Sequence, residues 1–291
     1  MSDGHTTLAV DLGGTNLRTA LVRSDRMEVP TTVPHGASRN APLVVGELVR
    51  LLAGAAAGVP LAGVGISVAG TVDEHSGVVR VADNLGWRDL PLAPLLEDAI
   101  GAPVSVETDT LCGARAEARL GGGKADCCLF IAIGTGIGHA WIIDGRVWRG
   151  AAGAATMFGH LVVEPGGLPC YCGNRGCLCQ YASGPVIGRA LDGPQWTSVQ
   201  DAATAALALA VAHALTLLNP EEVVIGGGAA GRWPDLGVLA ARIEGLVHPQ
   251  VRPIRLRRSA LGSEANWFGA ALLVVDDLGL VSEERGSRAG A

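Results

Sequence analysis

The 291-residue sequence is poor in positive charge, with 22 Lys and Arg against 28 Asp and Glu and a formal net charge of −6. Lys124 is the only lysine, which we interpret as coding bias. Proteins that bind nucleic acid need a surplus of Lys and Arg to neutralise phosphates. The composition therefore argues against nucleic acid as the main partner.

The chain also lacks a long hydrophobic run and a signal-like start. No apolar stretch reaches the ~20 residues that a membrane helix needs. The longest candidate, residues 202–218, is Ala-rich and contains His213, which favours a packed helix. Residues 1–7 are polar and include no apolar segment of a secretory signal. We therefore predict a cytoplasmic protein without membrane association, whose seven cysteines are reduced or metal-bound.

Glycine, by contrast, is abundant, with 42 residues, about twice its usual share. The glycines do not follow the G-X-Y period of collagen; they cluster after apolar runs. Hydrophobic residues make up 48% of the chain, enough for a sizeable core. At roughly 150 residues per domain, the length predicts one large domain or two medium ones.

Segments of strand and helix character alternate, which predicts an α/β architecture. Strands are expected at residues 7–12, 17–22, 61–68, 104–107, 127–133, 140–143 and 222–225. Helices are expected at residues 41–54, 92–100, 111–120, 202–218 and 265–275. A strand, a Gly-Thr turn and a second strand occur twice, which indicates two lobes. We place them at residues 1–120 and 121–291, divided near the Gly run 121–123, with the C-terminal helix able to pack back on the first lobe.

The two Gly-Thr turns, at residues 13–15 and 134–136, directly follow apolar strands. Without a Cβ, glycine lets backbone N–H groups approach phosphate oxygens closely. The P-loop pattern GxxxxGK[ST] and the pattern G-x-G-x-x-G are both absent. A tight hairpin without a ligand is the alternative for either turn. The Gly-Thr turn occurs twice, with Asp11 and Thr135 in matching sequence context. This repetition favours phosphate binding over a hairpin without a ligand.

Together these motifs resemble those of the actin-like, sugar-kinase and heat-shock ATPase superfold. Segment 11–16 (DLGGTN) resembles its first phosphate motif, 133–138 (IGTGIG) its second, and 224–228 (VIGGG) its adenosine motif. The resemblance covers residues 8–278 and implies a two-lobed actin-like, ribonuclease H-like α/β fold with the active site in the interlobe cleft. It implies ATP with Mg²⁺, and Asp11 would hold the magnesium through water or orient phosphate. The residues that it assigns to the nucleotide are Asp11, Gly13, Gly14, Thr15, Asn16, Gly134, Thr135, Gly136, Gly227 and Gly228.

One histidine and three cysteines have the spacing of a structural zinc site. They form the pattern H-x9-C-x-C-x4-C and are His160, Cys170, Cys172 and Cys177. Three thiolates and an imidazole match a closed, four-coordinate zinc site in a loop of residues 160–177. The alternative is three free cysteines near a histidine. The cysteines expected to pack as small hydrophobic residues are Cys112, Cys127 and Cys128.

The Gly-His pair followed by C-x-C-G-x-x-G-C resembles the signature of the ROK family. This family comprises repressors, uncharacterised open reading frames and sugar kinases. It implies that the zinc shapes a sugar pocket and that the chain is an ATP-dependent kinase for the primary, 6-OH-type hydroxyl of a hexose-like sugar. Because the family is commonly dimeric, it also implies a homodimer. ROK repressors carry a helix-turn-helix domain before the first phosphate motif, and only ten residues precede Asp11 here.

Asp109 is the candidate general base. It follows a short expected strand and precedes a helix, where a carboxylate could accept the proton of an attacking hydroxyl. A helix N-cap is the alternative, for which Thr108 or Asp109 is suited. Thr108 and Asp109 stand where the family has Asn-Asp, and the resemblance implies that Asp109 is the base.

Three expected sugar contacts depart from the family. Met157 and Cys179 replace glutamates and Thr108 replaces asparagine, and a buried polar mismatch costs ~1–3 kcal/mol per group. This predicts a modified sugar, such as a kanosamine-like aminodeoxyhexose or a C7-cyclitol, rather than glucose. The alternatives are an ordinary glucokinase or N-acylhexosamine kinase with rearranged contacts, and a catalytically weak sugar-binding protein. The expected substrate-binding residues are Gly70, Asn84 (whose alternative is a turn residue), Thr108, Asp109, Met157, His160 and Cys179.

Overall fold

The computed structural model describes residues 6–13, 16–23, 26–27, 31–34, 40–55, 58–122, 125–190, 193–231 and 235–279. The chain divides into two compact units, which we call unit 1 (Met1–Asp109 with Trp267–Ala291) and unit 2 (Thr110–Asn266). The chain thus passes from unit 1 to unit 2 at residues 109–110, whereas the sequence suggested a boundary at 121–123.

Unit 1 is built on a mixed sheet of order β3-β2-β1-β5-β9, with β4 paired to β2. The strands are β1 (Thr6–Leu12), β2 (Asn16–Arg23), β3 (Arg26–Met27), β4 (Thr31–Pro34), β5 (Gly63–Val68) and β9 (Val104–Thr108). β1 and β2 form the predicted antiparallel hairpin, and β5 and β9 run parallel to β1.

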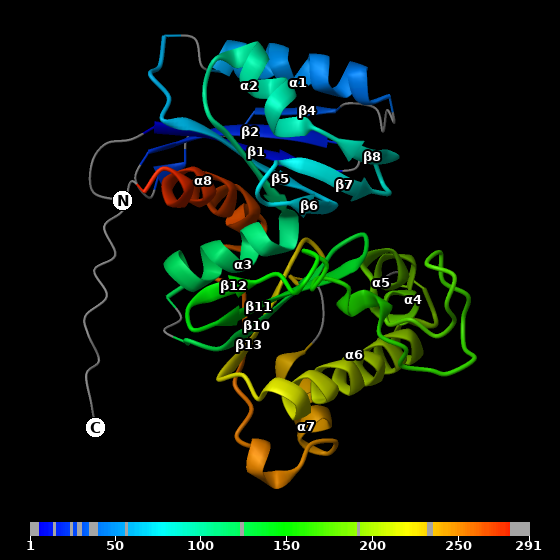
Figure 1. The fold of residues 1–291 in the computed structure, drawn as a ribbon. Helices are drawn as coiled ribbons and strands as arrows, with labels where there is room; N and C mark the ends of the chain where they lie inside the picture. Colours follow the sequence, from blue (N-terminus) through cyan, green and yellow to red (C-terminus); the bar gives the residue numbers. More distant parts are fainter. Residues whose placement is uncertain are drawn as a thin grey trace, which may run out of the picture. The chain divides into compact units, whose positions relative to one another are not determined.

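Helices cover both faces of this sheet (Figure 1). α1 (Ala41–Ala55) and α2 (Leu92–Ile100) share a core with Val64 and Ile66 of β5, while α8 (Ala265–Asp277) lies on the opposite face. A Cβ on Gly65 would come within 1.8 Å of the carbonyl oxygen of Ala270. Only glycine therefore permits α8 to pack this close to β5. A small sheet that the sequence did not predict, β6 (Thr71–Asp73), β7 (Val78–Ala82) and β8 (Trp87–Leu90), follows β5.

Unit 2 repeats the sheet topology of unit 1. Its strands are β10 (Cys128–Ile133), β11 (Ile137–Ile143), β12 (Arg146–Trp148), β13 (Glu222–Gly226) and β14 (Leu256–Arg258), in the order β12-β11-β10-β13-β14. β10 and β11 are antiparallel, and β13 and β14 extend the sheet in parallel. The turn between β11 and β12 has positive φ at Asp144 (52°) and Gly145 (69°).

The alternation of side chains along β10 divides unit 2 into two layers. Phe130 packs with Leu111 of α3 (Asp109–Leu120), whereas Leu129 and Ile131 belong to the larger core on the other face. The helices around that core are α4 (Cys179–Ala182), α5 (Gly184–Ala190), α6 (Trp196–Leu218) and α7 (Leu236–Glu244). The described part of unit 2 also contains the short 3-10 helices η1 (Phe158–His160), η2 (Pro249–Val251) and η3 (Gly262–Glu264).

α6 is, among the described residues, the one helix long and apolar enough to cross a membrane by length and composition. Half of its most apolar window is buried inside the protein. Leu207 and Val211 are fully buried in the core of unit 2. α6 is therefore the packed helix that residues 202–218 predict.

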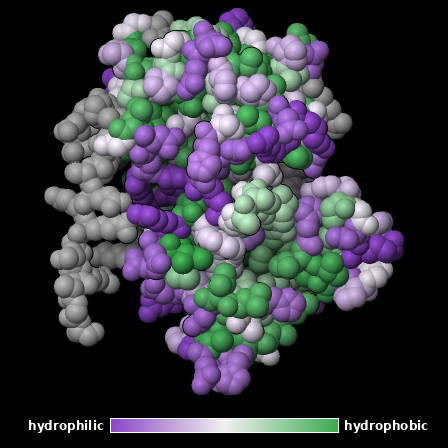
Figure 2. All heavy atoms as spheres, viewed as in Figure 1, coloured by the Kyte–Doolittle hydropathy of each residue, from purple (hydrophilic) through white to green (hydrophobic). Residues whose placement is uncertain are grey.

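The surface carries apolar side chains among polar ones (Figure 2), some of them over α6 and α7. The large apolar residues exposed on or beside these helices are Leu217, Leu218, Val238 and Leu246. Single exposed apolar residues are ordinary, but a group of them is typical of a contact surface.

Candidate active site and metal centre

The expected catalytic residues of unit 1 lie at the carboxyl edge of its parallel strands. The strand registers align Leu12 with Val68, and Val68 with Thr108. The residues at or just after these ends therefore share one edge, and they include Gly13, Gly70 and Asp109. In open α/β sheets, ligands bind at this edge.

Asp11 is held from both neighbouring strands. The hydroxyl of Ser67 donates to Asp11 Oδ1 over 3.4 Å, and Arg18 Nη1 lies 3.8 Å from Oδ2. The Arg18 guanidinium is in turn 5.9 Å above the ring of Trp267. A carboxylate oxygen fixed in this way suits a hard cation such as Mg²⁺.

Thr108 and Asp109 stand where β9 passes into α3. The Thr108 hydroxyl donates to the carbonyl of Gly70 over 2.8 Å, and the Thr108 amide donates to Glu107 Oε1 over 2.9 Å. Asp109 is half-buried at the first position of α3. The hydrogen bond of Thr108 thus fixes the backbone directly before the expected base.

Gly70 also contacts the segment that leads to Asn84. A Cβ on Gly70 would lie 2.5 Å from the carbonyl oxygen of Val81. Asn84 is exposed in the turn between β7 and β8. That Asn84 contacts substrate stays a prediction. In the first phosphate turn, Gly14 and Thr15 lie outside the described residues, as does the side chain of Asn16.

The second phosphate turn, residues 134–136, closes the β10–β11 hairpin. The amide of Gly134 donates to the carbonyl of Gly136 over 2.9 Å. Thr135 and Gly136 are exposed. Apart from the adjoining residues of the turn, no described atom lies within 4 Å of where a Cβ on Gly134 or Gly136 would stand. The backbone of this turn therefore faces open space that phosphate oxygens could fill.

The Gly run 226–228 packs directly against this turn. Gly227 has φ +89°, and a Cβ there would lie 2.5 Å from the carbonyl oxygen of Ile133. That carbonyl accepts the amide of Ala229 over 2.9 Å, and the carbonyl of Gly134 accepts the amide of Gly184 over 2.8 Å. The structure thus brings together Gly134, Thr135, Gly136, Gly227 and Gly228, the five residues of unit 2 that the sequence assigned to the nucleotide.

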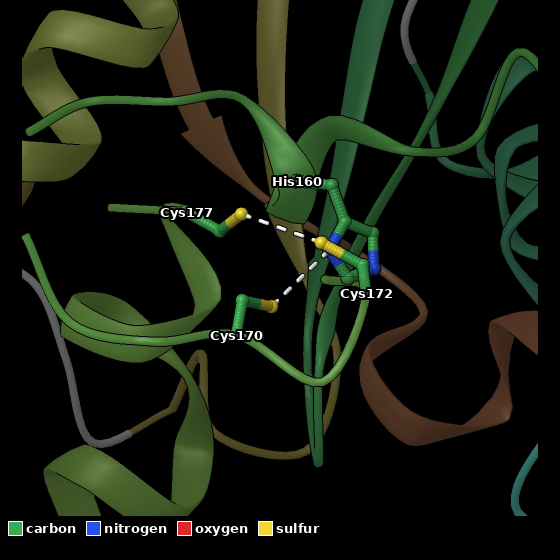
Figure 3. Close-up of side chains that lie close together, drawn as sticks. All are labelled: His160, Cys170, Cys172 and Cys177. Carbon is green, nitrogen blue, oxygen red and sulfur yellow. Dashed lines mark hydrogen bonds between the residues drawn. The ribbon is translucent and has the colours of Figure 1, made fainter. Parts of the chain in front are cut away.

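The four predicted zinc ligands converge (Figure 3). Their donor atoms all lie within 4.8 Å of one another. His160 Nδ1 is 3.6 Å from Cys170 Sγ, and Cys172 Sγ is 3.6 Å from Cys177 Sγ. With Zn–S near 2.3 Å and Zn–N near 2.0 Å, a tetrahedral site has edges of about 3.5–3.8 Å. The donor set and its spacing fit zinc.

Backbone contacts shape the loop that supplies the three cysteines. Gly176 has φ +79°, and a Cβ there would lie 1.7 Å from the carbonyl oxygen of Glu164. Gly173 has φ +91°. Two isolated bridges, Val162 with Cys177 and Pro169 with Arg175, fasten the loop onto itself. These backbone contacts hold the loop in the conformation that brings the three sulfurs together.

The thiols of this cluster differ in acidity. Burial raises the pKa of Cys170, but hydrogen bonds from Cys172, Cys179 and His160 outweigh it and bring the pKa to about 6. Burial and the neighbouring sulfurs raise the pKa of Cys177 to about 12. A bound cation would favour the thiolate form of both.

Met157 and Cys179, the expected sugar contacts beside the metal centre, have different surroundings. Met157 is 47% exposed just before η1, and its carbonyl accepts the amide of His160 over 2.9 Å. Cys179 is 5% exposed, and its Sγ lies 3.7 Å from Cys170 Sγ. That these two residues contact substrate stays a prediction.

Comparison with known proteins places these features in a family. Residues 7–277 match the ROK family. The chain belongs to the ROK family. It is 30% identical over 310 residues to a glucokinase of Halalkalibacterium halodurans, covering 92% of this chain and 94% of that protein. It is 31% identical over 291 residues to a kanosamine kinase of Amycolatopsis mediterranei, covering 91% and 95%.

A solved structure of a ROK family glucokinase from Streptomyces griseus, in complex with glucose and AMPPNP, has a similar fold. The TM-score is 0.80 at 28% identity, covering 92% of this chain and 98% of that chain. The predicted ROK membership and the predicted α/β fold of the actin-like superfold are confirmed.

Some residues of this ROK site could not be identified from the sequence. Ser67 sits in the buried strand β5, and its link to Asp11 depends on a strand register that the sequence does not show. Gly184 donates to the second phosphate turn from 50 residues further along the chain. Gln180 Nε2 lies 3.5 Å from Cys170 Sγ and 3.6 Å from Cys179 Sγ, and only its adjacency to Cys179 hinted at such a contact.

Proposed function

We propose that this ROK chain is an ATP-dependent kinase that phosphorylates the primary hydroxyl of a hexose-like sugar. The observation that carries the proposal is the placement of Asp109 at the edge of the sheet that also presents Asp11. Its family membership and its similarity to two sugar kinases of nearly full matching length support a kinase. The similarity to a glucokinase solved with AMPPNP supports ATP as the phosphoryl donor.

Asp109 accepts the proton of the attacking hydroxyl in this proposal. Asp11 holds Mg²⁺ through water, and the metal neutralises charge on the transferring phosphoryl group. The backbone amides of Thr135 and Gly136, which are exposed, bind phosphate oxygens, since that turn faces open space. Gly227 and Gly228 lie along the nucleotide in this proposal. A side chain at Gly227 would collide with Ile133, so only glycine lets this run pack against the second phosphate turn.

Zinc has a structural role in the proposal. His160, Cys170, Cys172 and Cys177 hold the ion, and a site with four protein ligands leaves no open position for catalysis. The ion fixes residues 160–177, which begin three residues after Met157. We propose that this loop shapes one wall of the sugar pocket.

The substrate, we propose, is a modified sugar or cyclitol. The hydroxyl of Thr108 has one proton, which it donates to Gly70, so it offers the substrate only lone pairs. An asparagine would offer an NH₂ donor and a carbonyl acceptor. Met157 offers no strong acceptor, and the Cys179 sulfur lies against Cys170. A substrate with an amine or an altered ring edge suits such a pocket better than glucose does.

A coupled ATPase assay with glucose, N-acetylmannosamine, several aminodeoxyhexoses and C7-cyclitols tests both the proposed kinase activity and the proposed substrate class. We expect the highest kcat/KM on an aminodeoxyhexose or a cyclitol. If glucose gives the highest kcat/KM, the ordinary glucokinase is correct and the modified substrate is wrong. If no sugar stimulates ADP release, the kinase proposal itself is wrong, and a sugar-binding protein takes its place.

We further propose that the protein is a cytoplasmic homodimer. The exposed apolar residues on and beside α6 and α7 support a self-contact surface. Light scattering of the purified protein measures the mass directly. Leu217→Glu, at a side chain that is 80% exposed, should convert a dimer into a monomer if the contact uses this surface.

A further inference from the structure

His160, the one nitrogen ligand of the proposed zinc site, has contacts at both ring nitrogens. Its Nδ1 lies 3.6 Å from Cys170 Sγ, and its Nε2 lies 3.1 Å from the hydroxyl of Tyr171. A neutral imidazole that binds a metal through one nitrogen carries its proton on the other. With Nδ1 toward the sulfurs and the ion, Nε2–H is therefore the donor and the Tyr171 oxygen is the acceptor.

The backbone on either side of His160 is held without Tyr171. The amide of His160 donates to the carbonyl of Met157 over 2.9 Å, and the amide of Leu178 donates to the carbonyl of Leu161 over 2.9 Å. These bonds hold η1 beside the cysteine loop, but they do not restrict rotation of the imidazole about its side-chain bonds. The orientation of the ring therefore needs contacts of its own.

Tyr171 supplies two such contacts from within the loop that carries the cysteines. Its ring meets the imidazole edge to face, with centroids 5.1 Å apart and an interplanar angle of 85°. Its hydroxyl is the partner of Nε2. Tyr171 is 73% exposed, so burial in a core does not explain its position. It lies between Cys170 and Cys172 in the sequence, so it is placed by two of the sulfur ligands.

We infer that Tyr171 is a positioning residue of the metal centre, which sets the tautomer and ring orientation of His160 so that Nδ1 faces the ion. Hydrogen-bond acceptors of this kind orient metal-binding histidines and raise their basicity. The inference rests on the zinc site proposed above. It leaves the four ligands of that site unchanged and adds a partner for one of them.

The other tyrosine of the chain provides a matched control. Tyr181 also bonds the cysteine loop, but its hydroxyl accepts a backbone amide, that of Leu168, over 2.8 Å. Tyr171→Phe and Tyr181→Phe each remove one hydroxyl and keep the ring. Comparing them distinguishes a loss of histidine orientation from a general loosening of the loop. Because Tyr171 is exposed, Tyr171→Phe should fold like the parent.

Zn²⁺ affinity of the parent and both variants is measured by competition with a chromophoric chelator. We expect Tyr171→Phe to weaken zinc binding about tenfold, the lower end of the range for such partners, because water can replace a hydroxyl at an exposed position. Tyr181→Phe should bind zinc like the parent. An unchanged affinity in Tyr171→Phe, or equal losses in the two variants, would overturn the inference.

Nuclear magnetic resonance of zinc-loaded protein with isotope-labelled histidine gives a readout that loop packing alone does not move. In the parent, Nδ1 of His160 should show the shift of a metal-bound nitrogen, and Nε2 should carry a proton that exchanges slowly with water. Tyr171→Phe should speed this exchange, and Tyr181→Phe should not. Metal binding through Nε2, or an exchange rate that Tyr171→Phe leaves unchanged, would refute the role of Tyr171 alone. Failure of the parent to bind zinc would instead refute the proposed zinc site.

Discussion

A buried carboxylate that anchors α3, the helix beginning at Asp109, gives the most direct test of the structure. Glu117 is 2% exposed. Its Oε2 accepts Arg257 Nη1 over 2.8 Å, and its Oε1 accepts the amide of Leu261 over 3.0 Å and the hydroxyl of Ser259. These contacts tie α3 to β14 and the segment after it. We predict that Glu117→Ala destabilises the protein by ~3 kcal/mol or more.

The size of this destabilisation follows from the hydrogen bonds that the partners of Glu117 lose. The charge-assisted bond to Arg257 is worth ~1.5–3 kcal/mol, and each of the two abandoned donors costs ~1–3 kcal/mol if it stays dry. Arg257 keeps its bidentate contact with Glu222, at 3.1 and 3.0 Å, so it is not left unpaired. The loss should therefore not exceed the ~3–5 kcal/mol of a broken buried pair. Glu117→Gln keeps an acceptor and should lose ~1.5–3 kcal/mol.

The effect should depend on pH. Burial raises the pKa of Glu117, but hydrogen bonds from Arg257, Ser259 and the amides of Leu261 and Ala260 outweigh it and hold the pKa below its usual 4.5. A carboxyl whose pKa is lower in the folded state stabilises the fold above about pH 4.5. This stabilisation is lost as the pH falls through the folded-state pKa. The difference in stability between parent and Glu117→Gln should thus shrink in acid.

Urea unfolding at pH 7 and at successively lower pH measures these differences. Glu47→Ala is the matched control, because Glu47 forms an ion pair with Arg50 on the surface of α1. Surface pairs contribute ~0–1 kcal/mol. If Glu117→Ala costs no more than Glu47→Ala at pH 7, or if its cost does not change with pH, the buried network does not stabilise the fold as argued.

Three further predictions concern activity and the metal. Asp109→Asn should lower kcat about 10²–10⁴-fold while leaving zinc content and circular dichroism unchanged, and activity within tenfold of the parent would exclude Asp109 as the base. Met157→Glu should raise kcat/KM for glucose about tenfold or more by adding a charged acceptor, whereas Met157→Leu should not; equal effects would remove Met157 from the pocket. Chelation of zinc should lower Tm and expose residues 160–177 to protease, and resistance to both would contradict a structural ion.

Much of the fold follows from local sequence patterns. Strands β1, β10 and β13 begin and end within one or two residues of the predicted segments, because each is a short, mostly buried apolar run that is followed directly by glycine. β11 begins at Ile137, earlier than the predicted 140–143. Gly138 concealed this start, since glycine is a weak strand former. In the structure, a Cβ at Gly138 would lie 2.5 Å from Thr110 Cγ2, so the close packing of α3 requires the glycine.

The sequence could not show which segments far apart in the chain pack against each other. The apolar face of α3 does not reveal which sheet it covers, and the sequence placed this helix in the first lobe. In the structure, Leu111 and Ala114 pack with Phe130 of unit 2. Glu117 and Arg257 are 140 residues apart, and no local pattern links them. Both facts depend on which surfaces pack together. The spacing of apolar residues along one helix shows its buried face but not the partner of that face.

Cys179, beside the proposed metal centre, is another residue whose surroundings the sequence could not show. The sequence treated its missing sugar-side carboxylate and its nearness to the zinc ligands as separate features. Cys179 stands where the resemblance to ROK sugar kinases implies a glutamate, and the substitution alone says only that a carboxylate is missing. The structure adds that the sulfur lies 3.7 Å from a zinc ligand, beneath the surface. Hydrogen bonds from neighbouring side chains outweigh burial and lower the pKa of Cys170 to about 6. The loss of the sugar-side carboxylate and the gain of a sulfur beside Cys170 are therefore one change. Restoring the acceptor through Met157, which is exposed, should be tolerated and should leave zinc content unchanged.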